Sequence, residues 1–307
     1  ATTEIYTRKI VGSVIDTCKA IAHGAANPGT DIWEFWKRRA PLTRSMPVGV
    51  VLTIPAAGSE TSDSAVLTNA EAGEKRGLNT PFNRPAFAIL DPLLAATLPV
   101  HQVACGVSDI LMHTLDRYFN PVTDNALTDE LAEALLRVVL EYGPAAVRDA
   151  HDETAMSEIM WAGSLSHNGL TGLGGRKDFA THQLGHALSE KFDVYHGDSL
   201  TAVWSSWARS VMDESPARFA RFARNVWHVE EADDTAAALA GIAKQEAFFQ
   251  SIGMPVRLGE LSCGRQDEAG LADLASRCSY GKTRTIGTFR VLDYESILAI
   301  YRRANEA

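Results

Sequence analysis

Two segments of the chain carry aspartate and histidine side chains at the spacing of one helical turn. His182 and His186 stand four residues apart, and so do Asp109 and His113. In an α-helix, residues separated by four lie on the same face, so each segment offers two potential ligands side by side. A further histidine, His196, follows fourteen residues after His182, beyond the expected end of that helix. Together these side chains predict a site for one divalent metal ion.

The types of ligand narrow the choice of metal. Imidazole nitrogens suit zinc or iron(II), and a single carboxylate adds charge without building an all-oxygen shell. Either helical pair alone is more typical of a structural pair or a solvated helix face, so the prediction depends on both pairs together with His196. A zincin protease is excluded, because its motif requires glutamate directly after the first histidine and this chain has Gln183 there.

The same residues resemble the metal-binding half of the iron-containing alcohol dehydrogenases, in particular the butanol dehydrogenases and NADPH-dependent aldehyde reductases. In that family a D-x-x-x-H helix, the first histidine of an H-x-x-x-H helix and a histidine fourteen residues further on hold the metal. The resemblance implies these ligands for Fe²⁺ or Zn²⁺: Asp109, His113, His182 and His196. It also implies that His186 is a catalytic residue, near the substrate and the nicotinamide but not a ligand.

Upstream segments resemble the cofactor-binding loops of this family. The first matches G-G-G-S-x-x-D-x-x-K but keeps one of its three glycines, and the second matches T-x-x-x-T-G-S-E with Ala57 in place of a threonine. From the residues alone, a small-residue turn at a helix start offers N–H groups to a pyrophosphate, although a plain helix start is more common. The resemblance implies six residues that contact NADP or NAD: Gly12, Ser13, Asp16, Thr53, Ser59 and Lys75.

The hydrophobic pattern divides the chain into two parts. Residues 47–55 and 85–92 predict buried strands, and residues 64–69 predict a short strand. A helix after residue 12 is expected to bury three positions: Val14, Cys18 and either Ile21 or Ala22. From residue 98 onward the apolar residues recur at helical spacing, with Gly143 and Pro144 expected to stop the helix of residues 128–141. The next helices are predicted at these ranges: 154–167, 178–192, 200–213, 216–226, 235–251, 267–276 and 294–303.

We therefore predict an α/β part, residues 1–96, that holds a truncated dinucleotide-binding sheet. Residues 97–307 are predicted to form an all-helical metal-binding domain. The resemblance implies a dehydroquinate synthase-like architecture, and it extends over nearly the whole chain.

Length and composition exclude several classes of protein. A chain of 307 residues is longer than one hydrophobic core usually organises, and no apolar run approaches the roughly 20 residues of a membrane span. A formal net charge of -9 without a cluster of Lys or Arg disfavours nucleic acid as a partner. The first residues lack the pattern of a signal peptide, and the four cysteines are widely separated, so a cytoplasmic protein with reduced thiols is expected.

The resemblance implies an oxidoreductase that transfers a hydride between a nicotinamide cofactor and a small alcohol or aldehyde. An alternative is a metal-binding remnant of the family without dehydrogenase activity, because the glycine loop is incomplete. A third hypothesis, a zinc-dependent cyclase or glycerol dehydrogenase relative, fits the Asp109 and His113 pair less well. About ten residues precede the glycine loop, and on that basis we expect a homodimer and weaker cofactor binding than in longer relatives.

Overall fold

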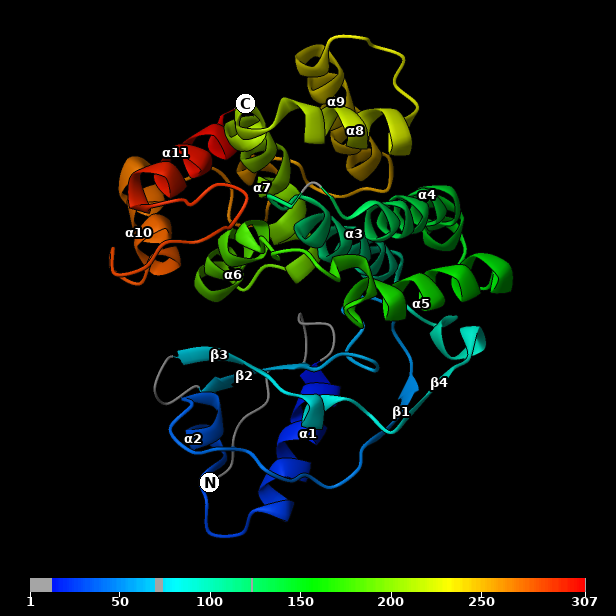
Figure 1. Ribbon diagram of the computed structural model, residues 1–307, viewed down its shortest axis with the longest axis vertical. Helices are drawn as coiled ribbons and strands as arrows, with labels where there is room; N and C mark the ends of the chain where they lie inside the picture. Colours follow the sequence, from blue (N-terminus) through cyan, green and yellow to red (C-terminus); the bar gives the residue numbers. More distant parts are fainter. Residues whose placement is uncertain (1–12, 70–73, 123, 307) are drawn as a thin grey trace.

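The computed structural model describes residues 13–69, 74–122 and 124–306. Strands and two helices form the first part of the chain, and the part that follows is built from helices (Figure 1). The predicted fold class, an α/β part followed by a mostly helical part, is confirmed. The boundary between two domains at residues 96 and 97 stays a prediction.

The strands of the described residues form two small sheets. β1 (Gly49–Leu52) pairs in parallel with β4 (Phe87–Leu90), and β2 (Ser64–Asn69) pairs antiparallel with β3 (Glu74–Asn79). Three of these strands were expected from the hydrophobic pattern. β3 was not, because it begins with three charged residues and has a single apolar side chain, Leu78, so it forms by pairing with β2.

The expectation that β1 and β4 are buried is wrong for one face of their sheet. Val50 and Leu52 are buried, but Val51, Phe87 and Ile89 are 54%, 60% and 51% exposed. Side chains alternate between the two faces of a strand, and only one face of this sheet is covered within the described residues. A continuous β-branched run in the sequence does not reveal which face is covered.

The first helix, α1 (Ser13–Ala26), turns a different face inward from the one predicted. Ala22 is buried as expected, and so is Ala20, but the buried face also carries polar residues, among them Asp16 and Lys19, which form an ion pair with 3.6 Å between Oδ1 and Nζ. The remaining residues predicted to be buried are exposed: Val14, Cys18 and Ile21. The pattern of apolar residues does not predict this face, because Asp16 and Lys19 are buried through their hydrogen bonds to the backbone of β2 and not through apolar contact. The second helix, α2 (Ile32–Trp36), is capped by Asp31, whose side chain accepts a hydrogen bond from the Trp33 N–H.

The helical part contains nine α-helices within the described residues: α3 (Val100–Tyr118), α4 (Ala126–Arg148), α5 (Glu153–His167), α6 (Ala180–Phe192), α7 (His196–Val211), α8 (Pro216–Trp227), α9 (Asp234–Ser251), α10 (Glu268–Cys278) and α11 (Tyr294–Asn305). Short 3-10 turns connect several elements: η1 (Pro81–Asn83), η2 (Pro92–Ala95), η3 (Leu170–Gly172), η4 (Met212–Glu214) and η5 (Leu258–Glu260). Among the described helices, none has the combined length and apolarity that crossing a membrane requires.

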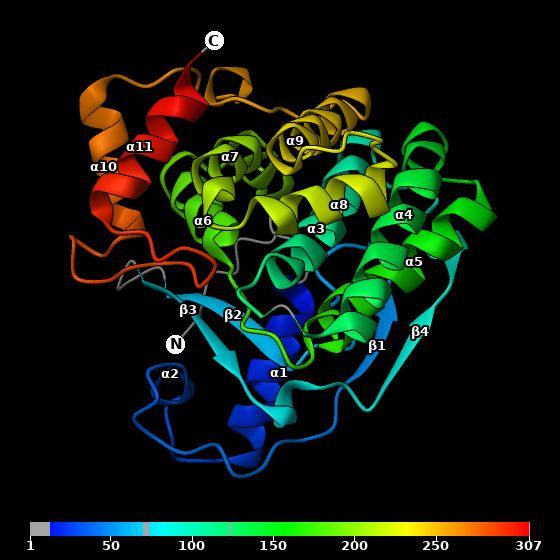
Figure 2. The same cartoon turned by 45° about the horizontal axis from the view of Figure 1, so that its top comes forward.

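Helix α3 lies at the centre of this part. Every residue from Val103 to Tyr118 is buried, and α3 packs against α4, α5, α6 and α7 (Figure 2). A helix enclosed in this way holds its polar side chains away from water, so Asp109 and His113 on α3 need partners inside the protein.

Two helix ends differ from the prediction. Helix α4 continues through Pro144 to Arg148 although Pro144 cannot donate a backbone hydrogen bond, because packing against α3 and α5 holds this turn in place. His196, expected in a loop, is the first residue of α7. The chain therefore enters α7 with this imidazole already at the helix start.

Candidate metal centre

Four of the residues selected from the sequence lie together where α3, α6 and the start of α7 meet. Asp109 Oδ1 is 3.5 Å from His113 Nε2, 3.7 Å from His182 Nε2 and 3.6 Å from His196 Nε2. Asp109, His113 and His182 can each place a ligand atom within 4.8 Å of the others. Asp109 and His113 of α3 thus face His182 of α6, and the start of α7 adds His196 as the fourth side chain.

These separations fit a single metal ion. Two ligand atoms that each lie about 2.0–2.3 Å from a tetrahedral ion are about 3.3–3.8 Å apart, and the three distances from Asp109 Oδ1 fall in that range. Both carboxylate oxygens of Asp109 and Nε2 of His182 are buried and make no hydrogen bond to any part of the protein that the structure describes. Buried polar atoms are rarely left without a partner, so the donor set fits a cation bound between them.

A second carboxylate orients one of these histidines. Asp116 Oδ2 lies 2.5 Å from His182 Nδ1, and its side chain is fully buried. A hydrogen bond from Nδ1 to a carboxylate leaves Nε2 as the atom that faces Asp109, which is the tautomer that binds a metal. The sequence places Asp116 on one polar stripe with Asp109 and His113, but it does not predict the contact with His182. Its signal is its position seven residues after Asp109, two turns along the same face of α3.

The charge of the centre is balanced by His182 when no cation is bound. Burial lowers the pKa of His182, but its contacts with Asp109 and Asp116 prevail and raise that pKa to about 9. Burial and the neighbouring His167 hold the pKa of His113 well below its usual value, so that imidazole is neutral. A divalent cation would replace the proton on His182 and meet a neutral nitrogen on His113.

His167, at the end of α5, is a further member of this group. Its ring centroid lies 4.0 Å from that of His113, and its Nδ1 is buried without a hydrogen bond to the described residues. Burial and the Arg117 guanidinium keep the pKa of His167 well below its usual value. His167 has no ligand-spaced partner along the chain, because its contact with His113 depends on how α5 packs against α3.

His186 lies beside the centre rather than within it. Its ring stacks on that of His196 with 5.3 Å between centroids, and it lies 6.2 Å from the ring of His182. It is half-buried, whereas His182 and His196 are buried. His186 therefore lies next to the four side chains with part of its own surface exposed.

The loop after β1 reaches the same region. Gly58 has a φ of +60°, and a Cβ there would lie 2.6 Å from the Gly163 carbonyl oxygen and 2.7 Å from the Cβ of His167. On the other side, a Cβ at Gly106 of α3 would lie 2.2 Å from the Pro55 carbonyl oxygen. Glycine at these two positions lets the backbone of residues 55–59 pass between α3 and α5. The loop therefore contacts His167, whose ring lies beside that of His113.

The six candidate cofactor residues fall into three groups. Ser59 is buried in this loop, and Thr53 is exposed at the end of β1. Asp16 Oδ2 accepts a hydrogen bond from the Val66 N–H at 2.8 Å, so its carboxylate contacts β2. Gly12 and the side chains of Ser13 and Lys75 lie outside the described residues.

Lys19 stands at the lysine position of the G-G-G-S-x-x-D-x-x-K motif and links α1 to the neighbouring strand. Its Nζ is fully buried, donates to the Ser64 carbonyl oxygen at 2.8 Å, and pairs with Asp16. Burial lowers the pKa of Lys19 and raises that of Asp16. The two residues tie α1 to β2, the strand that follows the loop.

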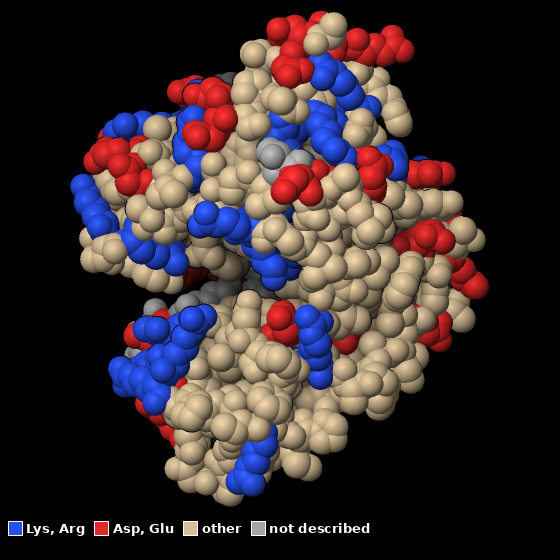
Figure 3. Space-filling model, in the orientation of Figure 1, with Lys and Arg blue, Asp and Glu red and all other residues tan. Residues whose placement is uncertain are grey.

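The surface is hollowed between the α/β part and the helical part, and Lys and Arg side chains lie along both borders of the hollow (Figure 3). This local positive charge contrasts with the net charge of -9 for the chain. Such a hollow attracts anionic groups such as phosphates.

Family models match both parts of the chain. A model described as "Fe-containing alcohol dehydrogenase family, C-terminal" covers residues 102–305, and one described as "Iron-containing alcohol dehydrogenase" covers residues 11–92. The probable NADH-dependent butanol dehydrogenase 1 of Bacillus subtilis is 36% identical over 95% of this chain and 74% of its own length. The NADPH-dependent aldehyde reductase YqhD of Escherichia coli is 35% identical over 81% of this chain and 65% of its own length.

Solved structures give the same result. The crystal structure of E. coli YqhD matches with a TM-score of 0.89 and 31% identity, covering 95% of this chain and 75% of that one. The NADH-dependent butanol dehydrogenase A of Thermotoga maritima matches with a TM-score of 0.89 and 28% identity, covering 96% and 75%. The family predicted from the two ligand-spaced helices is confirmed, and the chain belongs to the iron-containing alcohol dehydrogenase family.

Proposed function

We propose that the protein transfers a hydride between NAD(P) and a short alcohol or aldehyde. Four residues would hold Fe²⁺ or Zn²⁺ for this reaction: Asp109, His113, His182 and His196. The observation that carries the proposal is the convergence of three histidine nitrogens within 3.5–3.7 Å of one buried carboxylate oxygen that has no other described partner. Relatives named for NADH-dependent and NADPH-dependent reactions on butanol and aldehydes support the choice of reaction.

A bound metal ion would supply Lewis-acid polarisation of the substrate C–O bond. The protein's own part is to hold that ion in a dry, preorganised pocket, since Asp109, His113, His182 and His196 are all buried. Asp116 keeps His182 in one tautomer and orientation. The reaction then depends on holding the carbinol carbon against the nicotinamide ring, so that the hydride passes directly between two carbons.

We assign the proton transfer to His186. In alcohol oxidation the hydroxyl proton leaves while the hydride leaves from carbon, and a group beside the centre must take that proton. His186 is half-buried and stacks on His196, so it can face both the substrate and water. In aldehyde reduction the same residue would return a proton to the oxygen.

The loop of residues 53–59 is the proposed seat of the nicotinamide and its phosphates. Its passage between Gly106 and Gly163 brings small side chains and backbone N–H groups within reach of His167 and His113. Thr53 and Ser59 are proposed to contact NADP or NAD here, together with Gly12, Ser13 and Lys75. For Asp16, the hydrogen bond that it accepts from the Val66 N–H supports an indirect part, in which it ties α1 to β2, the strand that follows the loop.

A screen with metal-loaded protein tests the reaction. The consumption of NADH and of NADPH is followed with a series of short aldehydes, with Asp109→Asn as the matched variant that keeps shape but removes the charge. Turnover by the wild type and its loss in Asp109→Asn are expected. No turnover with any aldehyde and no change in nicotinamide fluorescence on titration would instead favour a metal-binding remnant without dehydrogenase activity.

Location and assembly are further proposals. The described cysteines, Cys18, Cys105, Cys263 and Cys278, are all free, which supports a reducing compartment such as the cytoplasm. A homodimer is proposed on the basis of the exposed apolar face of β1 and β4. Light scattering of the purified protein measures this assembly directly.

A further inference from the structure

A second cluster of metal-ligating side chains lies one turn away from the first. Along α3, His101, Cys105, Asp109 and His113 follow one another at intervals of four residues, so all four lie along one face of the helix. The last two belong to the centre described above. The first two meet Asp198, which lies in the first turn of α7.

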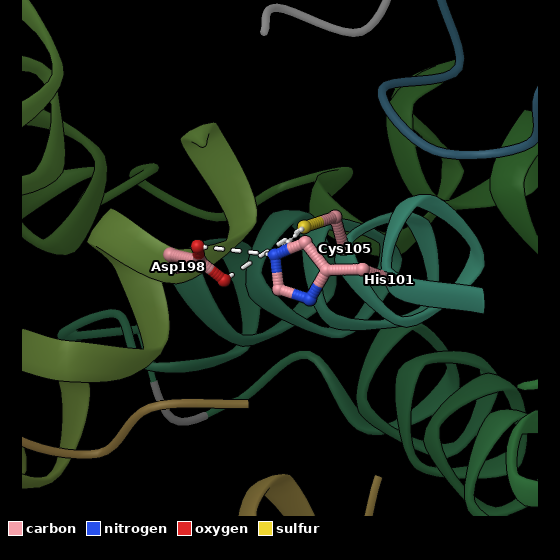
Figure 4. A group of neighbouring side chains, drawn as sticks. All are labelled: His101, Cys105 and Asp198. Carbon is pink, nitrogen blue, oxygen red and sulfur yellow. Dashed lines mark hydrogen bonds and ion pairs between the residues drawn. The ribbon is translucent and has the colours of Figure 1, made fainter. Parts of the chain in front are cut away.

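The three side chains converge on a single point (Figure 4). His101 Nε2 is 3.1 Å from Asp198 Oδ2 and 3.6 Å from Cys105 Sγ, and Sγ is 3.9 Å from Asp198 Oδ1. These separations are close to the roughly 3.3–3.8 Å expected between ligands of one tetrahedral ion. A thiolate, an imidazole and a carboxylate together form a donor set that zinc takes in proteins.

The geometry argues against a nucleophilic Cys-His-Asp triad. A triad requires the cysteine at one ring nitrogen of the histidine and the carboxylate at the other. Here both Cys105 and Asp198 meet the same nitrogen, Nε2 of His101, as the dashed lines of Figure 4 show. Burial raises the pKa of the Cys105 thiol, so without a cation it is a poor nucleophile.

An ion could reach this cluster from solvent. His101 and Asp198 line a pocket of about 770 Å³ together with Tyr195 and Glu260. The side chain of His101 is 42% exposed, whereas Cys105 is 3% exposed and forms the closed end of the group. Water from the pocket can complete the coordination of an ion held by the three side chains.

We propose that His101 Nε2, Cys105 Sγ and the Asp198 carboxylate bind a second divalent transition-metal ion, of which Zn²⁺ is the best fit. On binding, the Cys105 S–H proton is released to solvent and the thiolate becomes a ligand. The ion joins the first two turns of α3 to the first turn of α7, one helical turn from Asp109 and two residues from His196. It therefore braces the two helices that carry part of the first centre.

Cobalt provides a probe that separates the two sites, because a thiolate ligand to Co²⁺ gives a charge-transfer absorption in the near ultraviolet and the first centre has no thiolate. Metal-free protein is titrated with Co²⁺, and bound Zn²⁺ is counted separately by elemental analysis after gel filtration. We expect two metal equivalents per chain for both ions. We also expect the thiolate absorption to accompany one of the two cobalt equivalents.

Variants assign the absorption to its residue. Cys105→Ser should remove the absorption and one equivalent, whereas Cys263→Ser, a half-buried cysteine outside the cluster, should keep both. Loss of a residue that only supports a ligand costs about 10- to 100-fold in metal affinity, so loss of a ligand such as His101 or Asp198 should cost at least that. His113→Ala should lose the other equivalent and keep the absorption.

A single metal equivalent in the wild type, without thiolate absorption, would overturn the proposal and leave the cluster as a hydrogen-bonded structural group. Absorption that survives in Cys105→Ser would overturn it too. Because the first of these readings uses the wild-type protein, the result does not depend on whether a variant folds.

Discussion

At the scale of single residues, spacing along a helix carried most of the information about the centre. Asp109 with His113 and His182 with His186 could be selected from the sequence because four residues bring side chains to one face of a helix. His167 could not, since its contact with His113 is made across helices and has no local pattern. Asp116 shares its helix face with Asp109, but the sequence does not show that it meets His182, which is 66 residues away.

Asp116 is expected to strengthen metal binding although it does not face the ion. Replacing it by asparagine keeps an acceptor for His182 Nδ1 but removes the negative charge that makes the imidazole a better ligand. We expect Asp116→Asn to bind metal about 10- to 100-fold more weakly, measured by competition with a chelator of known affinity. Asp213→Asn is the matched control, because Asp213 pairs with Arg290 on the surface. Equal affinities for the two variants would show that Asp116 has no part in the centre.

His186 is expected to matter for turnover and not for metal content. His186→Ala leaves the four proposed ligands in place and removes the group assigned to proton transfer. Turnover should fall by about 10²- to 10⁴-fold, which is the usual contribution of a positioned acid or base. Elemental analysis of the same sample should give the wild-type metal content. Undiminished turnover would mean that His186 serves packing alone.

At the scale of elements, the chain's helices were easier to predict than the faces they bury. α1 was expected to bury apolar residues, but its inner face carries Asp16 and Lys19, whose side chains satisfy backbone groups of β2. Likewise, the exposed face of β1 and β4 follows from what covers the sheet and not from the composition of either strand. His196 was assigned to a loop because the start of α7 has no side-chain cap to mark it.

The loop of residues 55–59 is expected to depend on close packing against α3. In Gly106→Ala the added methyl carbon would lie 2.2 Å from the Pro55 carbonyl oxygen, so the loop must move away. Such overpacking costs about 1–3 kcal/mol of unfolding free energy, measured by urea denaturation. The displaced loop should also raise KM for the reduced cofactor while the metal content stays unchanged.

Gly77→Ala serves as the control for this change. An added methyl group there would meet Val66 at an ordinary distance of 3.8 Å. If both variants showed the same stability and the same KM, the contact between Gly106 and Pro55 would have no role in positioning the loop.

At the scale of the whole molecule, two parts with different chemistry meet at one hollow. The helical part supplies the ligand-bearing helices α3, α6 and α7, and the α/β part supplies the loop that passes between α3 and α5. The order of strands followed by helices could be predicted from hydrophobic periodicity, and the family from its spaced ligands. The meeting of the loop with His167 could not, because it depends on the packing of residues more than a hundred positions apart.

Turnover as a function of bound metal tests this account most directly. Protein stripped of metal is titrated with Fe²⁺ or Zn²⁺, and the consumption of reduced nicotinamide cofactor with a short aldehyde is measured at each step for the wild type and for His182→Ala. We predict that the stripped wild type is inactive, that its turnover rises with the metal equivalent bound at Asp109, His113, His182 and His196, and that His182→Ala stays inactive at every metal concentration. Full turnover by the stripped protein, or equal turnover by His182→Ala, would contradict it.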